Sequence, residues 1–302
     1  MSWPQHFPSR VLARIAALPS SRLRRTHARR RRLRALPWQL WPDASTRRHW
    51  WRSFRRAPYG MQLFFSAAIV LTVLVALNAT YQVVRKPSEL FFPVSSALNK
   101  TPEQTWRDYA PIFRQHATGV MTPSLLAALA QVEASGNPLA RTYWRWSWSS
   151  AQAFDVYRPA SSSVGMYQMT DGTFAQARHL CIHDHAVAQD GPWNHWHSCW
   201  FNALYTRVVP SHAVELTSAY LDRNVATILD RHGLEASALS RKQQLAALIH
   251  LCGAGAGELF VRRRFHLTAG QRCGDEDIRS YLARVQSLQG VFNRLGNEAL
   301  AN

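Results

Sequence analysis

Acidic residues are almost absent from the first 56 positions of this 302-residue chain, and charged residues of either sign are absent from positions 57–84. The first segment has fifteen arginines, no lysine and one acid, Asp43. The net charge of +18 therefore comes mainly from this tail, because the rest of the chain carries only about +4. The high isoelectric point is a property of the tail and not of the domain that follows.

The uncharged segment 57–84 has a strongly apolar centre at residues 61–79, which is 19 residues long. A helix of roughly 20 apolar residues crosses a bilayer and satisfies its own backbone hydrogen bonds there. A buried core helix, the first alternative, is usually shorter and interrupted by polar positions. A cleaved signal peptide is disfavoured by the long charged segment in front and by the poor cleavage site at Leu77-Asn78-Ala79. No cysteine near the exit supports a lipid anchor, so we predict an uncleaved signal anchor.

The charge on either side of this segment predicts its orientation. Fifteen arginines precede it, whereas only Arg85 and Lys86 closely follow it. Basic flanks stay in the cytoplasm. We therefore expect a single-pass protein of the inner membrane, with a cytoplasmic N-terminus and a periplasmic C-terminal domain.

The basic tail, residues 1–56, has no steady helical period and is predicted to be largely disordered. Docking on anionic lipid headgroups is one function that fits it. Contact with nucleic acid is another, since arginines interleaved with aromatics suit phosphates and stacked bases. We expect no nucleic-acid partner, because the predicted membrane separates the tail from the domain with site-like features.

Cysteine is scarce, and none precedes the apolar segment. The four cysteines are Cys181, Cys199, Cys252 and Cys273. They would lie in a compartment where disulfides persist, and they allow three pairings. On short spacing alone we favour Cys181–Cys199 and Cys252–Cys273, each worth roughly 3 kcal/mol in the chain-entropy model.

Past the apolar segment, prolines mark residues 85–110 as a linker region, and helical patterns dominate from there. Thr101 is predicted to cap a helix that begins at Pro102. Further helices are expected at 123–133, 211–229, 241–251 and 276–295. No clear strand pair or internal repeat is visible. The sequence therefore predicts a mainly α domain with long loops over residues 111–295.

The acid Glu133 closes the apolar stretch 125–132. The C-terminal end of a helix and apolar neighbours both favour the protonated form of a carboxyl group. A general acid that works near neutral pH needs that property. Taken alone, such an acid is more typical of an exposed helix end.

Two short motifs follow the acid and change that interpretation. Ser135-Gly136-Asn137-Pro138 ends the helix and turns the chain. Gly165-Met166-Tyr167-Gln168 then offers a glycine for close approach, an apolar floor and an amide that can bond a sugar. Small turns with a glutamine are common, so the second motif is informative mainly because it follows the acid.

The region from about residue 115 to 290 resembles the lytic transglycosylases, bacterial enzymes that cleave peptidoglycan. The family pattern of a glutamate, a serine and an Asn-Pro turn matches Glu133, Ser135, Asn137 and Pro138. Its Gly-Leu-Met-Gln element is similar to Gly165-Met166-Tyr167-Gln168, and its late acid-then-tyrosine element to Asp277 and Tyr281. The resemblance implies a lysozyme-like (goose-type) domain in which Glu133 is the acid/base, Gln168 binds glycan and Tyr281 points at the site.

The sequence departs from the family at two places. Where the family has Ala-Tyr-Asn-Ala-Gly, this chain reads Ile249-His250-Leu251-Cys252-Gly253, so His250 takes over part of the polar role. The segment 139–164 is longer than is usual and rich in aromatics: Tyr143, Trp144, Trp146, Trp148, Phe154 and Tyr157. An extended glycan cleft and a packed structural flap are equally compatible with this insert.

Most glycosidases use two carboxylates, and here only Asp155 and Asp171 lie near the motif, with no spacing that positions either. The resemblance implies that the substrate supplies the nucleophile, so that no metal or cofactor is required. A histidine-rich cluster offers a rival zinc site: His179, Cys181, His183, Asp184, His185, His195, His197 and Cys199. Its spacings match no standard zinc pattern, and we expect a disulfide-stapled loop instead.

These features together predict a membrane-anchored lytic transglycosylase. It would cut the MurNAc-GlcNAc β-1,4 linkage of peptidoglycan and leave 1,6-anhydroMurNAc ends, and an envelope-spanning secretion or conjugation complex is a candidate partner. Two alternatives stay open: a hydrolytic muramidase, and a non-catalytic glycan-binding or assembly subunit of a transport apparatus. The substrate-contact residues expected are Ser135, Gly165, Met166, Tyr167, Gln168, His250 and Tyr281.

Overall fold

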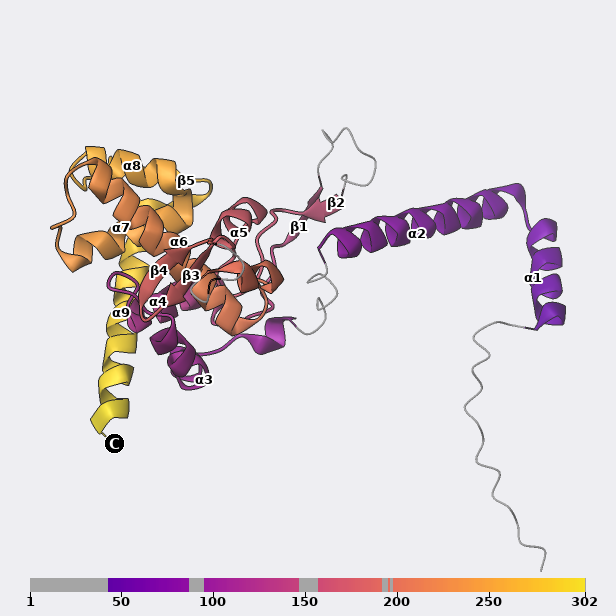
Figure 1. Ribbon diagram of the computed structural model, residues 1–302. Coiled ribbons are helices and arrows are strands. Elements are labelled where there is room, and N and C mark those ends of the chain that lie inside the picture. Colours follow the sequence, from indigo (N-terminus) through magenta and orange to yellow (C-terminus); the bar gives the residue numbers. More distant parts are fainter. Residues whose placement is uncertain (1–42, 87–94, 147–156, 192–194, 196–197, 302) are drawn as a thin grey trace, which may run out of the picture. The chain divides into compact units, whose positions relative to one another are not determined.

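The structure is a computed structural model that describes residues 43–86, 95–146, 157–191, 195 and 198–301. Contacts divide the chain into two units, Met1–Ser66 and Ala67–Asn302. The first 42 residues of the basic tail, and its predicted disorder there, lie outside the described part. The described residues are mainly helical, as predicted (Figure 1).

The end of the basic tail is helical, so the expectation of disorder up to residue 56 is wrong for α1 (Ala44–Arg56). Arg55 and Arg56 occupy the last turn, where cations interact favourably with the helix dipole. The Trp51 and Phe54 rings stack at 6.0 Å, and the Arg55 guanidinium lies over the Trp51 ring at 5.3 Å. Neighbours at three and four positions thus support a helix that the sequence reading missed.

The apolar segment forms one helix, α2 (Tyr59–Arg85). Residues Tyr59–Val84 are long and apolar enough to cross a membrane, and an apolar window of 18 residues within them contains no buried residue. Two of its polar side chains are satisfied within the helix: Thr72 and Thr80 donate hydrogen bonds to the carbonyls four residues earlier, each at 2.8 Å. The orientation of this helix in a membrane stays a prediction.

The second unit continues with a short 3-10 helix, η2 (Ser95–Leu98), and the helix α3 (Pro102–Gln115). α3 starts as predicted: Thr101 accepts from the Gln104 amide, and the Gln104 side chain bonds back to Thr101, forming a capping box. Trp106 on α3 is buried in the core. The packed domain therefore begins before residue 111, and the linker assigned to residues 85–110 is too long.

The centre of the domain is α4 (Pro123–Ala134), in which residues 124–130 are all buried. A helix that is apolar on every side is stable only when other elements surround it. α4 packs against α3 and against α9 (Ile278–Ala301), whose residues lie far away in the sequence (Figure 1). The middle of α4 is thus enclosed by the core, whereas its last turn, residues 131–134, is half-buried.

Two of the remaining helices match predicted segments closely: α6 (Pro210–Arg231) matches 211–229, and α7 (Leu239–Cys252) matches 241–251. The shorter helices α5 (Asp171–Ala177), η4 (Trp200–Leu204) and α8 (Ala254–Arg262) were not predicted. α9 begins at Ile278 rather than at 276, because the two preceding residues pair as a strand. Asp277 instead caps it, accepting a hydrogen bond from the Ser280 amide at 2.8 Å.

Within the described residues, three short antiparallel strand pairs correct the expectation that no strands pair. They are β1 (Trp144–Trp146) with β2 (Tyr157–Pro159), β3 (Leu180–His183) with β4 (Ala186–Gln189), and β5 (Arg272–Cys273) with β6 (Glu276–Asp277). The turn between β3 and β4 is formed by Asp184 and His185, both with positive φ. This turn contains no glycine, so the sequence gives only a weak indication of a hairpin here.

One of the two predicted disulfides forms. Cys181 on β3 bonds Cys199 just before η4, with an S–S distance of 2.10 Å. Cys252 and Cys273 are free thiols, so their predicted pairing is wrong for this structure. The Cys273 thiol donates to the Leu251 carbonyl at 3.4 Å instead. Short sequence spacing brings two sulfurs near each other but does not decide whether they bond.

Candidate active site

Glu133 lies in the last turn of α4, where the buried face of that helix reaches the edge of the core. Its side chain is 17% exposed, so it is neither sealed in the core nor free in solvent. The Tyr281 hydroxyl donates a hydrogen bond to Glu133 Oε1 at 2.5 Å. His250 Nε2 lies 3.5 Å from the same oxygen. The second carboxylate oxygen, Oε2, carries neither of these contacts.

Tyr281 comes from α9 and is 2% exposed. Burial, reinforced by the Glu133 carboxylate, raises the pKa of Tyr281 well above its usual value. The phenol therefore keeps its proton and acts only as a hydrogen-bond donor to Glu133 at physiological pH. A donor fixed in the core orients the carboxyl group without itself reacting.

His250 comes from the last turn of α7. Burial lowers the pKa of His250, although the nearby Glu133 carboxylate partly opposes this shift. The imidazole is therefore neutral near pH 7. Its ring meets the edge of Tyr167, with 6.3 Å between centroids and 85° between planes. The Tyr167 hydroxyl is itself held by the Leu126 carbonyl at 3.1 Å, so the packed core sets the position of His250.

The turn after Glu133 is closed by Ser135 and Gly136, both with positive φ. The Gly136 amide donates to the Ala130 carbonyl at 3.0 Å, which satisfies an otherwise open end of α4. A Cβ at Gly136 would lie 2.2 Å from Thr105 Oγ1. Position 136 therefore requires glycine, both because its φ is positive and because Thr105 leaves no room for a Cβ. Ser135 is the C-cap residue of α4.

The second motif forms a tight turn whose last residue, Gln168, has φ of 45°. The Gln168 amide nitrogen donates to the Gly165 carbonyl at 2.9 Å and to the Ala140 carbonyl at 3.2 Å. A Cβ at Gly165 would lie 2.1 Å from the Arg207 carbonyl oxygen. The turn therefore binds the start of the aromatic insert, and the Gln168 amide oxygen remains as the atom that can accept a hydrogen bond from a ligand.

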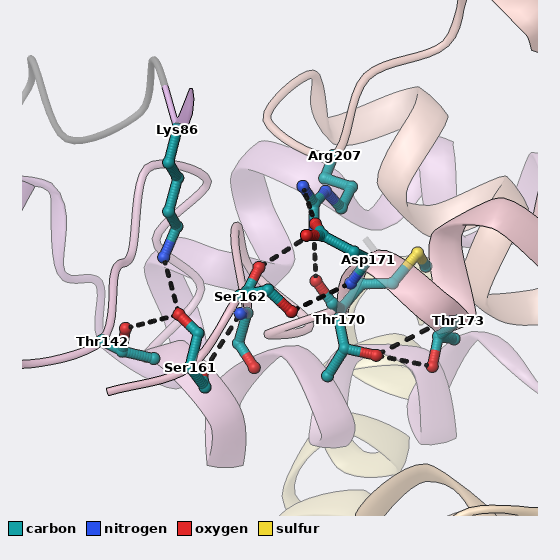
Figure 2. Close-up of polar contacts among 10 residues, drawn as sticks. Lys86, Thr142, Ser161, Ser162, Thr170, Asp171, Thr173 and Arg207 are labelled. Carbon is teal, nitrogen blue, oxygen red and sulfur yellow. Dashed lines mark hydrogen bonds and ion pairs between the residues drawn. The ribbon is translucent and has the colours of Figure 1, made fainter. Parts of the chain in front are cut away.

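Arg207 fixes the chain on both sides of this turn (Figure 2). Its guanidinium donates to the Ser162 carbonyl at 3.0 Å and to the Met169 carbonyl at 2.8 Å. It also forms an ion pair with Asp171 at 2.7 Å. Asp171, one of the two acids near the motif, is therefore bound to an arginine. Asp155, the other, lies outside the described residues.

A cavity of about 250 Å³ adjoins these residues. Its walls come from the Gln168 turn, from α6 and from the end of α7. The lining residues are Gln168, Met169, Thr170, Thr173, Thr217, Tyr220, Ile249, His250, Leu251, Cys252 and Gly253. Glu133 does not line the cavity itself, and it adjoins the cavity wall through His250.

The structure thus brings Glu133, His250 and Tyr281 together and places Gln168 on the same cavity as His250. Met166 and Tyr167 are 0% and 1% exposed, so they support the turn from beneath and present no surface to a ligand. The sequence reading missed Thr217 and Tyr220, which α6 places on the cavity wall. The Thr217 hydroxyl is buried and has no hydrogen-bond partner among the described residues. No sequence motif marks it.

The rival metal site finds no support in the described part of the chain, which contains no group of three or more histidine, cysteine or acidic side chains able to hold an ion. His197 of that cluster lies outside the described residues. Cys181 and Cys199 are bonded to each other, and His185 Nδ1 contacts the Ala117 carbonyl at 2.8 Å.

Of the aromatic insert, residues 147–156 lie outside the described part of the chain.

In comparisons with known proteins, the chain matches no family model, no curated protein and no solved structure. The functional assignment therefore depends on the site itself and on the motif resemblance.

Proposed function

We propose that the chain is a membrane-anchored lytic transglycosylase with a lysozyme-like domain. Its substrate would be the MurNAc-GlcNAc β-1,4 linkage of peptidoglycan, and its product would carry 1,6-anhydroMurNAc ends. The observation that carries the proposal is the Glu133 carboxyl group, which is partly shielded, accepts a hydrogen bond from Tyr281 through one oxygen, and lies beside His250, a residue of the cavity wall.

The two carboxylate oxygens of Glu133 have different roles in this mechanism. Tyr281 and His250 both contact Oε1, so Oε2 carries the proton to the glycosidic oxygen as the C1–O bond breaks. The C6 hydroxyl of the same MurNAc then attacks C1, and its proton returns to Oε2. The C1–O6 bond closes the anhydro ring, and the carboxyl group ends in its starting state. The route needs no second carboxylate, and none bonds to Glu133 among the described residues.

The cavity supports glycan recognition by polar contacts. The Gln168 amide oxygen, the neutral His250 and the hydroxyls of Thr170 and Thr173 can bond sugar hydroxyl and acetamido groups. Under this proposal α2 anchors the enzyme in the inner membrane with the domain in the periplasm. That position would suit local wall remodelling around an envelope-spanning secretion or conjugation complex.

The test is mass analysis of the muropeptides that the purified full-length protein releases from peptidoglycan. Anhydro products, lighter by one water than reducing ends, are expected. Glu133→Gln should lower their release by about 10²–10⁴-fold, the usual contribution of a general acid, and the exposed Glu235→Gln should not. Reducing ends would indicate the hydrolytic muramidase instead.

A non-catalytic glycan-binding subunit is the second candidate. Leu251 places an apolar side chain on the cavity wall, and both Gln168 amide hydrogens are taken by backbone carbonyls. Binding of glycan strands by the wild-type protein without any release of muropeptides would favour this second function.

A further inference from the structure

The helix α1 (Ala44–Arg56) contains no buried residue. It is a separate helix, because Ala57 after it is extended and Pro58 follows before α2 begins (Figure 1). A helix of 13 residues that no other element packs against is only marginally stable in water. α1 therefore has the properties of a helix that is completed by an external surface.

The charges of α1 are not compensated within its own unit, Met1–Ser66. That unit contains fifteen arginines and a single acid, Asp43, and α1 itself contains five arginines and no acid. Asp43 can neutralise at most one of the five. Among the described residues, no ion pair involves an arginine of α1. The helix therefore keeps a net positive charge whatever contacts it makes within the unit.

The side chains of α1 divide into an aromatic side and a basic side. Trp50 lies four positions before Phe54, and Trp51 three positions before it, so the three rings share one side of the helix. The Trp51 and Phe54 rings stack at 6.0 Å, and the two tryptophans are 63% and 58% exposed. The basic side, whose members are related by the same spacings, consists of Arg48, Arg52, Arg55 and Arg56.

The basic side destabilises the isolated helix. Arg48 and Arg52 are four positions apart, as are Arg52 and Arg56, and like charges at that spacing repel each other. The Arg55 guanidinium is partly accommodated by the Trp51 ring, over which it lies at 5.3 Å. An anionic surface along the basic side would replace this repulsion by attraction. Exposed tryptophan rings beside arginines are suited to the boundary between headgroups and acyl chains.

The surface of a membrane is next to α1 if α2 spans the bilayer. Only Ala57 and Pro58 separate α1 from the stretch Tyr59–Val84, which is long and apolar enough to cross. The Gln62 side chain, in the first turn of α2, donates to the Arg55 carbonyl at 3.2 Å and to the Ala57 carbonyl at 2.8 Å. These bonds satisfy open carbonyls at the end of α1 and hold that end to the start of α2.

We infer that α1 is an interfacial helix that binds the anionic phospholipids of the leaflet at the N-terminal end of α2. In this arrangement the aromatic side lies among the upper acyl chains and the basic side binds headgroup phosphates. Arg47 falls on the aromatic side, and its long side chain reaches the headgroups. A tail that only sets topology needs charge, but neither a helix nor an aromatic side. The inference depends on the proposed membrane span and not on glycan cleavage.

The test measures amide hydrogen exchange of the full-length protein in nanodiscs by mass spectrometry. Peptides that cover residues 44–56 should exchange roughly tenfold more slowly in phosphatidylcholine with phosphatidylglycerol than in phosphatidylcholine alone, because the anionic surface stabilises the helix. The paired substitutions Arg48→Gln with Arg52→Gln should remove most of this protection. Trp50→Ser with Trp51→Ser should do the same without a change of charge. Peptides from α6 should exchange equally in both lipids.

The matched control is Arg29→Gln with Arg30→Gln, which removes the same charge from the tail outside α1. If this pair lowers the protection as much as the α1 arginine pair does, the tail binds lipid through its total charge and the inference is wrong. Equal exchange in the two lipids also overturns it. Protection that appears with a single-stranded oligonucleotide but not with phosphatidylglycerol would assign α1 to nucleic acid. Carbonate extraction tests the span and muropeptide release tests the enzyme, so each premise fails separately.

Discussion

The Tyr281 hydroxyl donates to Glu133 Oε1 across 2.5 Å, although the two residues are 148 positions apart in the sequence. The contact joins the end of α4 to the first turn of α9, and these two helices pack against each other. It fixes which oxygen of the carboxyl group faces the protein, and the proposed chemistry uses the other one.

Tyr281→Phe should lower muropeptide release by about 10- to 100-fold. A hydrogen bond to a charged group contributes about 1.5–3 kcal/mol, and each 1.4 kcal/mol is a factor of ten. The measurement is the initial rate of product release, with Tyr109→Phe, a half-buried tyrosine on α3, as control. An unchanged rate in the Tyr281 variant would show that orientation of Glu133 by this phenol is irrelevant to activity.

Thr217→Val should leave the free energy of unfolding unchanged or raise it by about 1–3 kcal/mol, because a buried hydroxyl without a partner is lost. Glycan binding should weaken several-fold if Thr217 contacts the ligand. Ser218→Ala is the matched control: its hydroxyl is also buried without a partner among the described residues, but it does not line the cavity. Equal binding by both variants would remove Thr217 from the site.

The pH dependence of stability should reflect His116, which lies 3.7 Å from Glu215 and is buried. Burial lowers the pKa of His116 below 6.5, while the Glu215 carboxylate partly opposes this and His212 adds to it. The unfolded chain therefore binds the proton first. The contribution of neutral His116 to the free energy of unfolding is therefore fully present above pH 6.5 and is lost as the pH falls below that value.

Denaturant titrations at a series of pH values from 8 to 5 measure this loss for the wild type. Burial also lowers the pKa values of His212 and His250, so His116→Gln should reduce the loss without abolishing it. His266→Gln, an exposed histidine, should leave the profile as it is. A wild-type stability that rises on acidification would contradict the assignment.

The cysteines should give two reactive thiols in the unfolded, unreduced protein and four after reduction, because only Cys181–Cys199 is bonded. In the folded protein Cys252 should alkylate slowly at neutral pH. Burial, together with the adjacent Cys273 thiol, raises the pKa of Cys252 to about 12, which leaves about 10³-fold less thiolate than a free cysteine has. Finding no free thiol would restore the second predicted disulfide.

The sequence by itself determined the long helices α2, α3, α4, α6, α7 and α9 and the order of the site motifs. A run without charge, a Thr-Pro start and a mostly apolar stretch before Glu133 are local signals, because capping, helical period and hydrophobicity act over a few residues. They also indicated His250 and Tyr281 through the motif resemblance. The short strand pairs, α1 and the short helices α5, η4 and α8 were missed because their sequence signatures are weak.

Only the tertiary structure decided which of these residues meet. Packing of α9 and α7 around α4 brings Tyr281 and His250 to the same oxygen of Glu133, and no spacing in the sequence encodes that distance. Packing likewise buried Met166 and Tyr167, left Thr217 on the cavity wall and kept Cys252 reduced. The physical reason is that burial and long-range contact are properties of the assembled core, whereas sequence patterns report only the faces from which it is built.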